Sequence, residues 1–227
     1  MTDQMVRQRP DTHDMFVVHR VFRREAALMP HLVRAVRPGD LARAARVADH
    51  YRGYALGLHH HHTAEDELIW PLLLARVDLE AELVLRMEQQ HERVAAGLAA
   101  VAERLPGWER TADPATGDAI AVALAEHHAA LLEHLTDEET HLLPLIEEHL
   151  TAAEYGRLNE RFAAETPKDK LLLFLGALLE EATADETADI MRNLPMPAKL
   201  AWRFIGRRQY ARSTRDLRSQ LGPSRAG

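Results

Sequence analysis

The stretch His61–Pro71, HHTAEDELIWP, is followed 73 residues later by His134–Pro144, HLTDEETHLLP. With the next residue, both copies read H-x-x-x-E-[DE]-x-x-x-x-P-L. Residues four apart lie one turn apart on the same face of an α-helix, so each histidine and its glutamate can converge on one ion. The repeat therefore predicts two helices that each present an imidazole and a carboxylate to a shared site.

The sequence on either side of the two copies predicts an all-α protein. Ala, Leu, Glu and Arg fill the chain, and the alternation of β-branched residues that is typical of strands is absent. Turn signals lie at Arg37-Pro-Gly39, at Pro106-Gly107 and in a loop through Asp113-Pro114 and Gly117-Asp118. They delimit four helices at about 14–37, 40–71, 79–105 and 118–149. Four long helices with mostly short connections predict an up-down-up-down four-helix bundle.

The last third of the chain predicts a helical C-terminal extension. Thr151-Ala-Ala-Glu154 is a capping box that starts a helix ending near Ala164. Further helices are expected at 169–182, 185–193 and 197–221. We therefore divide the chain into an N-terminal tail (1–12), a bundle (13–150) and an extension (151–227).

The two remaining helices of the bundle each carry one candidate ligand. His19 lies on the first helix and His91 on the third, which with the repeat gives four histidines and two glutamates. Six ligands are too many for one zinc ion, whose sites are usually tetrahedral. They suit two ions, because carboxylates can bridge a metal pair while imidazoles cap it. Mixed histidine and carboxylate ligation is typical of non-haem iron, which is therefore the expected metal. Manganese would tolerate the same ligands, but both manganese and zinc are less favoured.

In the order H…HxxxE…H…HxxxE, the chain resembles the hemerythrin-like proteins of the HHE cation-binding family over about residues 13–150. The resemblance implies a four-helix bundle around a non-haem di-iron centre that binds oxygen or related small oxidants. Some relatives also use the residue after the second-helix histidine as a ligand, which here is His62. The implied ligands are His19, His61, Glu65, His91, His134 and Glu138, with the glutamates as bridges and His62 as a candidate seventh ligand.

The sequence also departs from the oxygen-carrying hemerythrins. Those proteins have HxxxH on the third helix and HxxxxD on the fourth. Here Met87 and Ala95 flank His91, and the fourth helix has HxxxE. A centre with fewer histidines argues against reversible oxygen storage, and an open iron position could admit peroxide, nitric oxide or a substrate.

Three further residues are candidates to support the ligands. Tyr54 and His127 each precede a repeat histidine by seven residues, and His141 follows Glu138 by three, so all three share a face with the site. They could hydrogen-bond to ligands, as metal-bound histidines normally require, or simply pack between helices.

Other residues near the repeat are expected to have structural or solvated roles. Asp66 and Glu139 directly follow the two glutamates and are expected to be solvated or to pair helices. His59 and His60 are expected at the surface, because four consecutive helical residues cannot all face the core. Proline lacks the amide donor that a helix needs, so Pro71 and Pro144 should kink or end their helices just past the site.

Composition excludes several classes of protein. The chain has 227 residues, 14 histidines and no cysteine, which rules out disulfides, thiolate metal sites and a cysteine nucleophile. A net charge of −7 argues against a nucleic-acid partner. The longest apolar run, 171–179, is too short to span a membrane, and the N-terminus lacks the apolar stretch of a signal peptide. We therefore expect a cytoplasmic protein.

The C-terminal segment differs in charge from the rest. Residues 195–227 hold eight Lys or Arg and one Asp, while the rest of the chain is strongly acidic. Trp202, Phe204, Ile205 and Tyr210 interleave with these arginines, which would suit an amphipathic helix on an anionic membrane or nucleic acid. We favour packing of the aromatic residues on the acidic bundle instead, and expect no membrane partner.

Together these features predict a di-iron protein that binds dioxygen, nitric oxide or peroxide. Redox turnover of peroxide or consumption of nitric oxide would be compatible with such a site, although the sequence leaves open whether the protein is an enzyme. The alternative is an iron- or oxygen-responsive protein whose C-terminal extension signals to a protein partner. A redox role would also require an electron donor.

Overall fold

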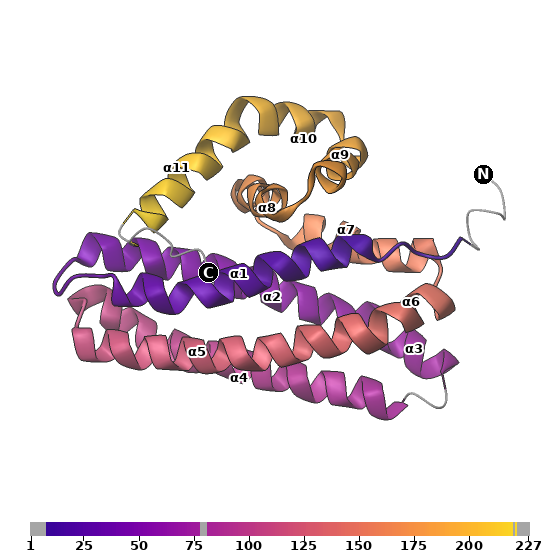
Figure 1. Cartoon of the computed structure of the whole chain (residues 1–227), viewed down its shortest axis with the longest axis horizontal. Coiled ribbons are helices and arrows are strands. Elements are labelled where there is room, and N and C mark those ends of the chain that lie inside the picture. Colours follow the sequence, from indigo (N-terminus) through magenta and orange to yellow (C-terminus); the bar gives the residue numbers. More distant parts are fainter. Residues whose placement is uncertain (1–7, 78–80, 220, 222–227) are drawn as a thin grey trace.

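The computed structural model describes residues 8–77, 81–219 and 221. Four long helices lie side by side in it: α1 (His13–Arg34), α2 (Leu41–Leu68), α4 (Ala81–Thr111) and α5 (Pro114–Asp137) (Figure 1). The described residues contain helices and no strands. The predicted all-α four-helix bundle is confirmed.

Two apolar clusters form the core of the bundle. The larger includes Phe22, Leu58 and Leu131, and the smaller includes Ile69 and Ile146. On each of the four helices, the candidate ligands lie between positions of the larger cluster and positions of the smaller one. The fold thus places the candidate ligands where the two clusters meet.

Capping residues set the starts of two bundle helices. The Asp40 carboxylate accepts a hydrogen bond from the Arg43 amide at 3.0 Å, and this caps α2 as predicted. The Asp113 carboxylate accepts one from the Thr116 amide at 2.8 Å and caps α5. The expected loop through residues 113–118 is therefore wrong: proline suits the first turn of a helix, and α5 begins at Pro114.

The expected end of the third helix at Pro106-Gly107 is also wrong. Helix α4 continues through Pro106 to Thr111, and Ala112 follows with a positive φ of 46°. Trp108, 1% exposed, and Leu105 are buried in the core, so packing outweighs the hydrogen bond lost at the proline. The expected start of this helix, Leu79, lies outside the described residues.

In both helices that carry a repeat, the regular α-helix is interrupted close to the glutamate. Helix α2 ends at Leu68, and α3 (Trp70–Arg76) starts with Pro71 in its first turn. Helix α5 passes into the π-helical turn η2 (Glu138–Leu142), and α6 (Leu143–His149) follows with Pro144 in its first turn. The expected end of the helix is confirmed at Pro71, whereas the chain stays helical from η2 into α6 across Pro144.

The π-turn has its own hydrogen-bonding pattern. The Leu143 amide donates to the Glu138 carbonyl, five residues earlier. The Thr140 hydroxyl donates a hydrogen bond of 2.7 Å to the Thr136 carbonyl, four residues earlier. In a regular α-helix, this carbonyl would accept from the backbone amide of Thr140. Single π-turns within α-helices often occur at functional sites.

The C-terminal extension covers one face of the bundle (Figure 1). Helix α7 packs against α2, α8 against α1, and α11 against α8. The predicted capping box of Thr151 and Glu154 is present at the start of α7. The helices of the extension are α7 (Ala152–Glu165), α8 (Lys168–Glu181), α9 (Ala184–Asn193), α10 (Met196–Ala201), the π-turn η3 (Trp202–Gly206) and α11 (Arg207–Arg218).

The basic C-terminal segment packs through only some of its aromatic residues. Trp202 and Tyr210 are half-buried, and Tyr210 lies close to Gly176 of α8. Phe204 and Ile205 are 65% and 59% exposed, so the expectation that they pack on the bundle is wrong. Residues two apart on a helix point in nearly opposite directions, so Phe204 faces away when Trp202 faces inward. Among the described residues, no helix is both long and apolar enough to cross a membrane.

Candidate metal centre

The structure brings all seven candidate ligands together, in two adjoining groups. One group contains His62, His91 and His134, and the ligand atoms of these histidines lie within 4.8 Å of one another. The other group satisfies the same limit and contains His19, His61, Glu65 and Glu138. The residues come from α1, α2 and α4 and from the junction of α5 with η2.

The two carboxylates lie between the two groups. Oε1 of Glu65 is 3.4 Å from Nε2 of His61, and its Oε2 is 3.7 Å from Nε2 of His91. Oε2 of Glu138 is 3.4 Å from Nε2 of His19 and 3.5 Å from Nε2 of His134. Each glutamate thus faces one histidine of each group, as bridging carboxylates would.

Two consecutive histidines of α2 serve different groups. Glu65 follows His61 by four residues and His62 by three, so the two imidazoles flank the carboxylate on the helix surface. The His62 ring stacks on His91, with centroids 4.0 Å apart, whereas the His61 ring lies 5.3 Å from that of His19. His62 thus provides a third histidine where the third helix lacks HxxxH.

Several polar atoms of this centre are buried without hydrogen-bond partners. His19, His134 and Glu138 are 0% exposed and Glu65 is 1% exposed. Burial of unpaired polar atoms is costly, and a bound cation would satisfy all of them at once. The unpartnered atoms are both carboxylate oxygens of Glu65 and of Glu138, and Nε2 of His62, His91 and His134.

Burial shifts several of these groups toward their neutral forms. It lowers the pKa of His61, His62 and His134 well below the usual value, and neighbouring histidines add to the effect. Burial, followed by the charge of Glu138, raises the pKa of Glu65 well above its usual value. Neutral imidazoles are the form that binds metal, and a cation would favour the ionised carboxylate.

Acidic residues on the outer side orient two of the histidines. His19 Nδ1 lies 2.9 Å from Oε1 of Glu139, which Arg23 holds with two hydrogen bonds of 2.5 and 2.9 Å. His91 Nδ1 lies 2.8 Å from Oδ1 of Asp66. When these Nδ1 atoms donate, each Nε2 keeps its lone pair toward the centre.

The expectation that Asp66 and Glu139 are solvated or pair helices is confirmed, and in both cases the partner is a candidate ligand on the neighbouring helix. One residue beyond a helical glutamate, the side chain points about 100° away, toward the neighbouring helix. From there Asp66 reaches His91 on α4, and Glu139 reaches His19 on α1. The acidic residue that follows the glutamate in both copies was the signal for this role.

His134 has a different outer partner. Its Nδ1 lies 3.4 Å from the Oε1 of Gln90, whose amide nitrogen donates to Asp137 at 3.0 Å. Gln90 directly precedes His91 and is 3% exposed. Sequence reasoning missed Gln90, because a single buried glutamine has no recurring pattern.

The three residues considered as supports lie farther out. The Tyr54 hydroxyl is 2.7 Å from Nε2 of His127, whose Nδ1 donates to the Val94 carbonyl at 3.3 Å. The two side chains therefore bond to each other instead of to a ligand, and burial lowers the pKa of His127 to about 4. His141 is exposed, as is His59, and His60 is half-buried.

Residues 11–146 match the family model described as the hemerythrin HHE cation binding domain. The chain belongs to this family. Comparisons with curated proteins and with solved structures give no match. The matched residues of the hemerythrin domain include all seven residues of the two groups.

Two hollows in the structure reach the two groups of the hemerythrin domain. A groove between α2 and α4 reaches the three-histidine group, and its lining includes His62, Asp66 and His91. On the adjacent face of the bundle, at α1 and α2, His61 of the other group lines a cavity beneath the C-terminal extension. The two groups thus differ both in histidine number and in surroundings.

Proposed function

We propose that the hemerythrin domain holds two iron ions and binds dioxygen, nitric oxide or peroxide. The observation that carries the proposal is that Glu65 and Glu138 lie between a three-histidine and a two-histidine group. One ion would be held by His62, His91 and His134, the other by His19 and His61, with both glutamates shared.

The donor set favours iron over the other metals considered. Five imidazoles and two carboxylates exceed the four ligands of a zinc site. Manganese prefers oxygen ligands, whereas most of these donors are nitrogen. Imidazole and carboxylate donors with open positions are typical of non-haem iron.

The bound pair would supply a redox-active centre for small oxidants, and the chain's own residues would control access to it. Glu139 and Arg23 fix the tautomer of His19, as Asp66 fixes that of His91. The two-histidine side has fewer protein ligands, which leaves room there for a small ligand. The Phe22 ring, with its centroid 5.1 Å from that of His61, keeps that side apolar.

Redox turnover of peroxide is compatible with this chain, because it has no cysteine that peroxide could oxidise. Peroxide consumption by iron-loaded protein should be compared with that of His91→Ala and Glu138→Ala. The exposed His141→Ala is the matched control, since it also removes one imidazole. Turnover that falls only in the first two variants would support an enzymatic role.

Metal analysis of protein purified without added metal tests the proposal directly. We expect two irons per chain, and a Mössbauer spectrum of a coupled pair after oxidation. One zinc per chain, or no metal after iron loading, would overturn the di-iron proposal.

A sensing role is the second candidate, and ion pairs between the bundle and the extension favour it. Arg161 of α7 pairs with Glu67 of α2 at 2.5 Å, and Arg20 of α1 pairs with Glu186 of α9 at 2.6 Å. Helices α1 and α2 carry His19 and His61, so metal binding could act on the extension through them. If peroxide turnover is negligible and metal removal changes the protease sensitivity of residues 165–227, the sensor proposal is supported.

A further inference from the structure

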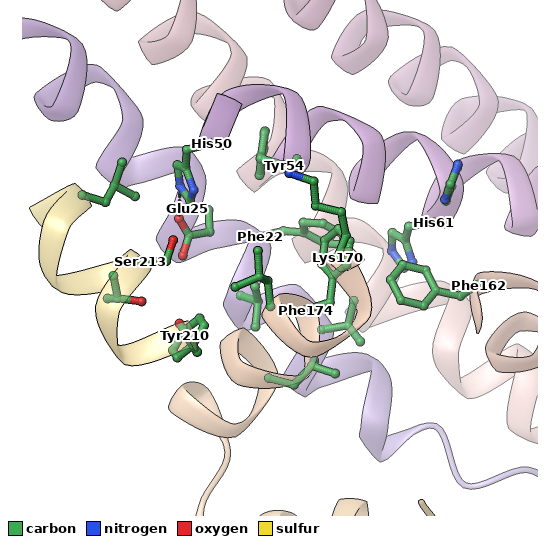
Figure 2. A pocket seen from close by; sticks show the side chains of 18 of the residues that line it. Phe22, Glu25, His50, Tyr54, His61, Phe162, Lys170, Phe174, Tyr210 and Ser213 are labelled. Atoms are coloured by element: carbon green, nitrogen blue, oxygen red, sulfur yellow. Dashed lines mark hydrogen bonds and ion pairs between the residues drawn. The ribbon is translucent and has the colours of Figure 1, made fainter. Parts of the chain in front are cut away.

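A cavity of about 500 Å³ lies between the bundle and the C-terminal extension (Figure 2). Its walls come from α1 and α2 on the bundle side and from α7, α8 and α11 on the other side. His61 lines it, so the cavity adjoins the two-histidine group. We refer to it as the chamber.

The chamber is elongated along α2. Its lining residues on that helix run from Ala45 to Ala64, which corresponds to about 28 Å at 1.5 Å per residue. His61 lies toward one end of this stretch, whereas Arg46 and Asp49 lie at the other and are exposed. A space of this shape suits a chain better than a compact ring system.

The walls of the chamber are mainly apolar. Phe22, Phe162 and Phe174 surround the part nearest His61 (Figure 2). Acidic groups in the wall already have partners: Glu25 lies 2.8 Å from His50 Nε2, and Asp14 accepts from the Tyr155 hydroxyl at 2.7 Å. The remaining apolar wall residues include Met15, Val18, Val21, Leu158, Leu173 and Leu178.

Two glycines of α2 differ in their surroundings, and only Gly53 lines the chamber. Gly57 lies under Phe174, and a Cβ atom there would be 2.7 Å from the Phe174 ring. A Cβ atom at Gly53 would meet nothing within 4 Å, so close packing does not require this glycine. Glycine within a helix is unfavourable relative to alanine, yet Gly53 stands in the middle of the chamber wall.

We infer that the chamber binds a linear, mainly aliphatic molecule with one end against His61. Its volume lies within the roughly 300–1,000 Å³ range of small-molecule sites and far exceeds the needs of dioxygen, nitric oxide or peroxide. Apolar walls favour an aliphatic chain, and a polar end group would lie toward Arg46, Asp49 and Lys170. Lys170 Nζ is only 3.4 Å from the exposed Asp49 carboxylate, so this end is polar and accessible.

The inference goes beyond the proposed function, because binding of the chain does not require iron. Only the position of the bound chain beside a metal ion rests on the proposed function. The two ideas can therefore fail separately, provided that binding is measured on both metal-free and iron-loaded protein.

Calorimetric titration with decanoic acid and with decan-1-ol tests the inference. We expect saturable binding of one molecule per chain for at least one of the probes. Preference for the acid would indicate a carboxylate end group, and preference for the alcohol an uncharged one. No binding of either probe would overturn the inference.

Gly53→Phe should fill the chamber and weaken binding about tenfold or more. Gly53→Ala is the matched control, because it adds one methyl group and leaves the chamber open. Gly156→Phe adds the same ring on α7 at a position that is also open and does not line the chamber. Equal affinities for Gly53→Phe and Gly53→Ala would overturn the inference, once circular dichroism shows that both are folded.

The iron-loaded protein supplies an independent readout. If the chain end lies against His61, decanoic acid or decan-1-ol should shift the absorption bands of the iron centre, and Gly53→Phe should abolish the shift. Binding without such a shift would contradict the placement beside His61. Binding to a protein that takes up no iron would leave the chamber inference standing while the di-iron proposal fails.

Discussion

Buried glutamates in two regions of this protein differ in whether the chain supplies partners for their carboxylates. Glu65 and Glu138 are 1% and 0% exposed, and their carboxylate oxygens have no hydrogen-bond partners. Glu25, 7% exposed, lies 2.8 Å from His50, 2.7 Å from Arg24 and 3.8 Å from Arg218. Glu25 is therefore neutralised by the chain itself, whereas the other two are arranged for an external cation.

The pKa values reflect this difference. Burial and the charge of Glu138 raise the pKa of Glu65. Burial would also raise the pKa of Glu25, but the hydrogen bonds and charges of His50 and Arg24 lower it to about 2. Burial alone thus does not distinguish the two candidate ligands from Glu25, whereas the absence of internal partners does.

The largest expected effect is the loss of metal affinity in the Glu138→Ala variant. Because Glu138 faces His19 and His134 of both groups, its loss should lower metal affinity by on the order of 100-fold or more. Metal analysis and the rise in Tm on adding Fe²⁺ measure this effect. Wild-type stoichiometry and affinity in the variant would contradict the bridging position.

The outer acidic residues should have smaller effects on metal affinity. Asp66→Asn and Glu139→Gln should each weaken metal binding by roughly 10–100-fold, because the histidine that each orients loses its charged acceptor. Competition with a chelator measures the change. Glu133→Gln, which alters an exposed residue next to His134, is the control and should bind metal normally.

Glu25→Gln should destabilise the protein by on the order of 2 kcal/mol at pH 7. The folded pKa lies below the usual value of 4.5, so the contribution of Glu25 is present above pH 4.5 and is lost as the pH falls toward 2. Urea unfolding of wild type and variant at several pH values tests this. If the difference in unfolding free energy between wild type and variant stays constant down to pH 3, the ionised carboxylate is not its cause.

The smallest expected effect is that of Glu65→Gln on the stability of the metal-free protein. Its raised pKa means that the ionised form is disfavoured, so a neutral glutamine should leave stability unchanged or raise it by about 1 kcal/mol at pH 7. Urea unfolding in chelator measures this effect. Destabilisation as large as that of Glu25→Gln would remove the distinction between the two regions.

The inner part of the site could be predicted from sequence because it follows local helix geometry. A histidine and glutamate four residues apart share a helix face in any bundle, and the 73-residue repeat indicated that two such faces meet. His62 was a weaker candidate, since its role depends on how closely α4 brings His91.

Features that depend on packing between helices could not be predicted. The continuation of α4 through Pro106 depends on the burial of Trp108, which the local sequence does not reveal. The chamber depends on how α7, α8 and α11 lie across α1 and α2. The periodicity of a segment predicts that a helix will pack, but not how far from its neighbour it will stop.

The π-turn at Glu138–Leu142 has a consequence for insertions and deletions in this chain. Such a turn accommodates one residue more than an α-helix of the same rise, and the exposed Thr140 lies within it. Deleting one residue here would restore α-helical geometry locally. Deleting one from the regular part of α5 would instead rotate the following core residues, such as Ile146, by about 100° out of register. The fourth helix should therefore tolerate a change in length beside Glu138 better than elsewhere along α5.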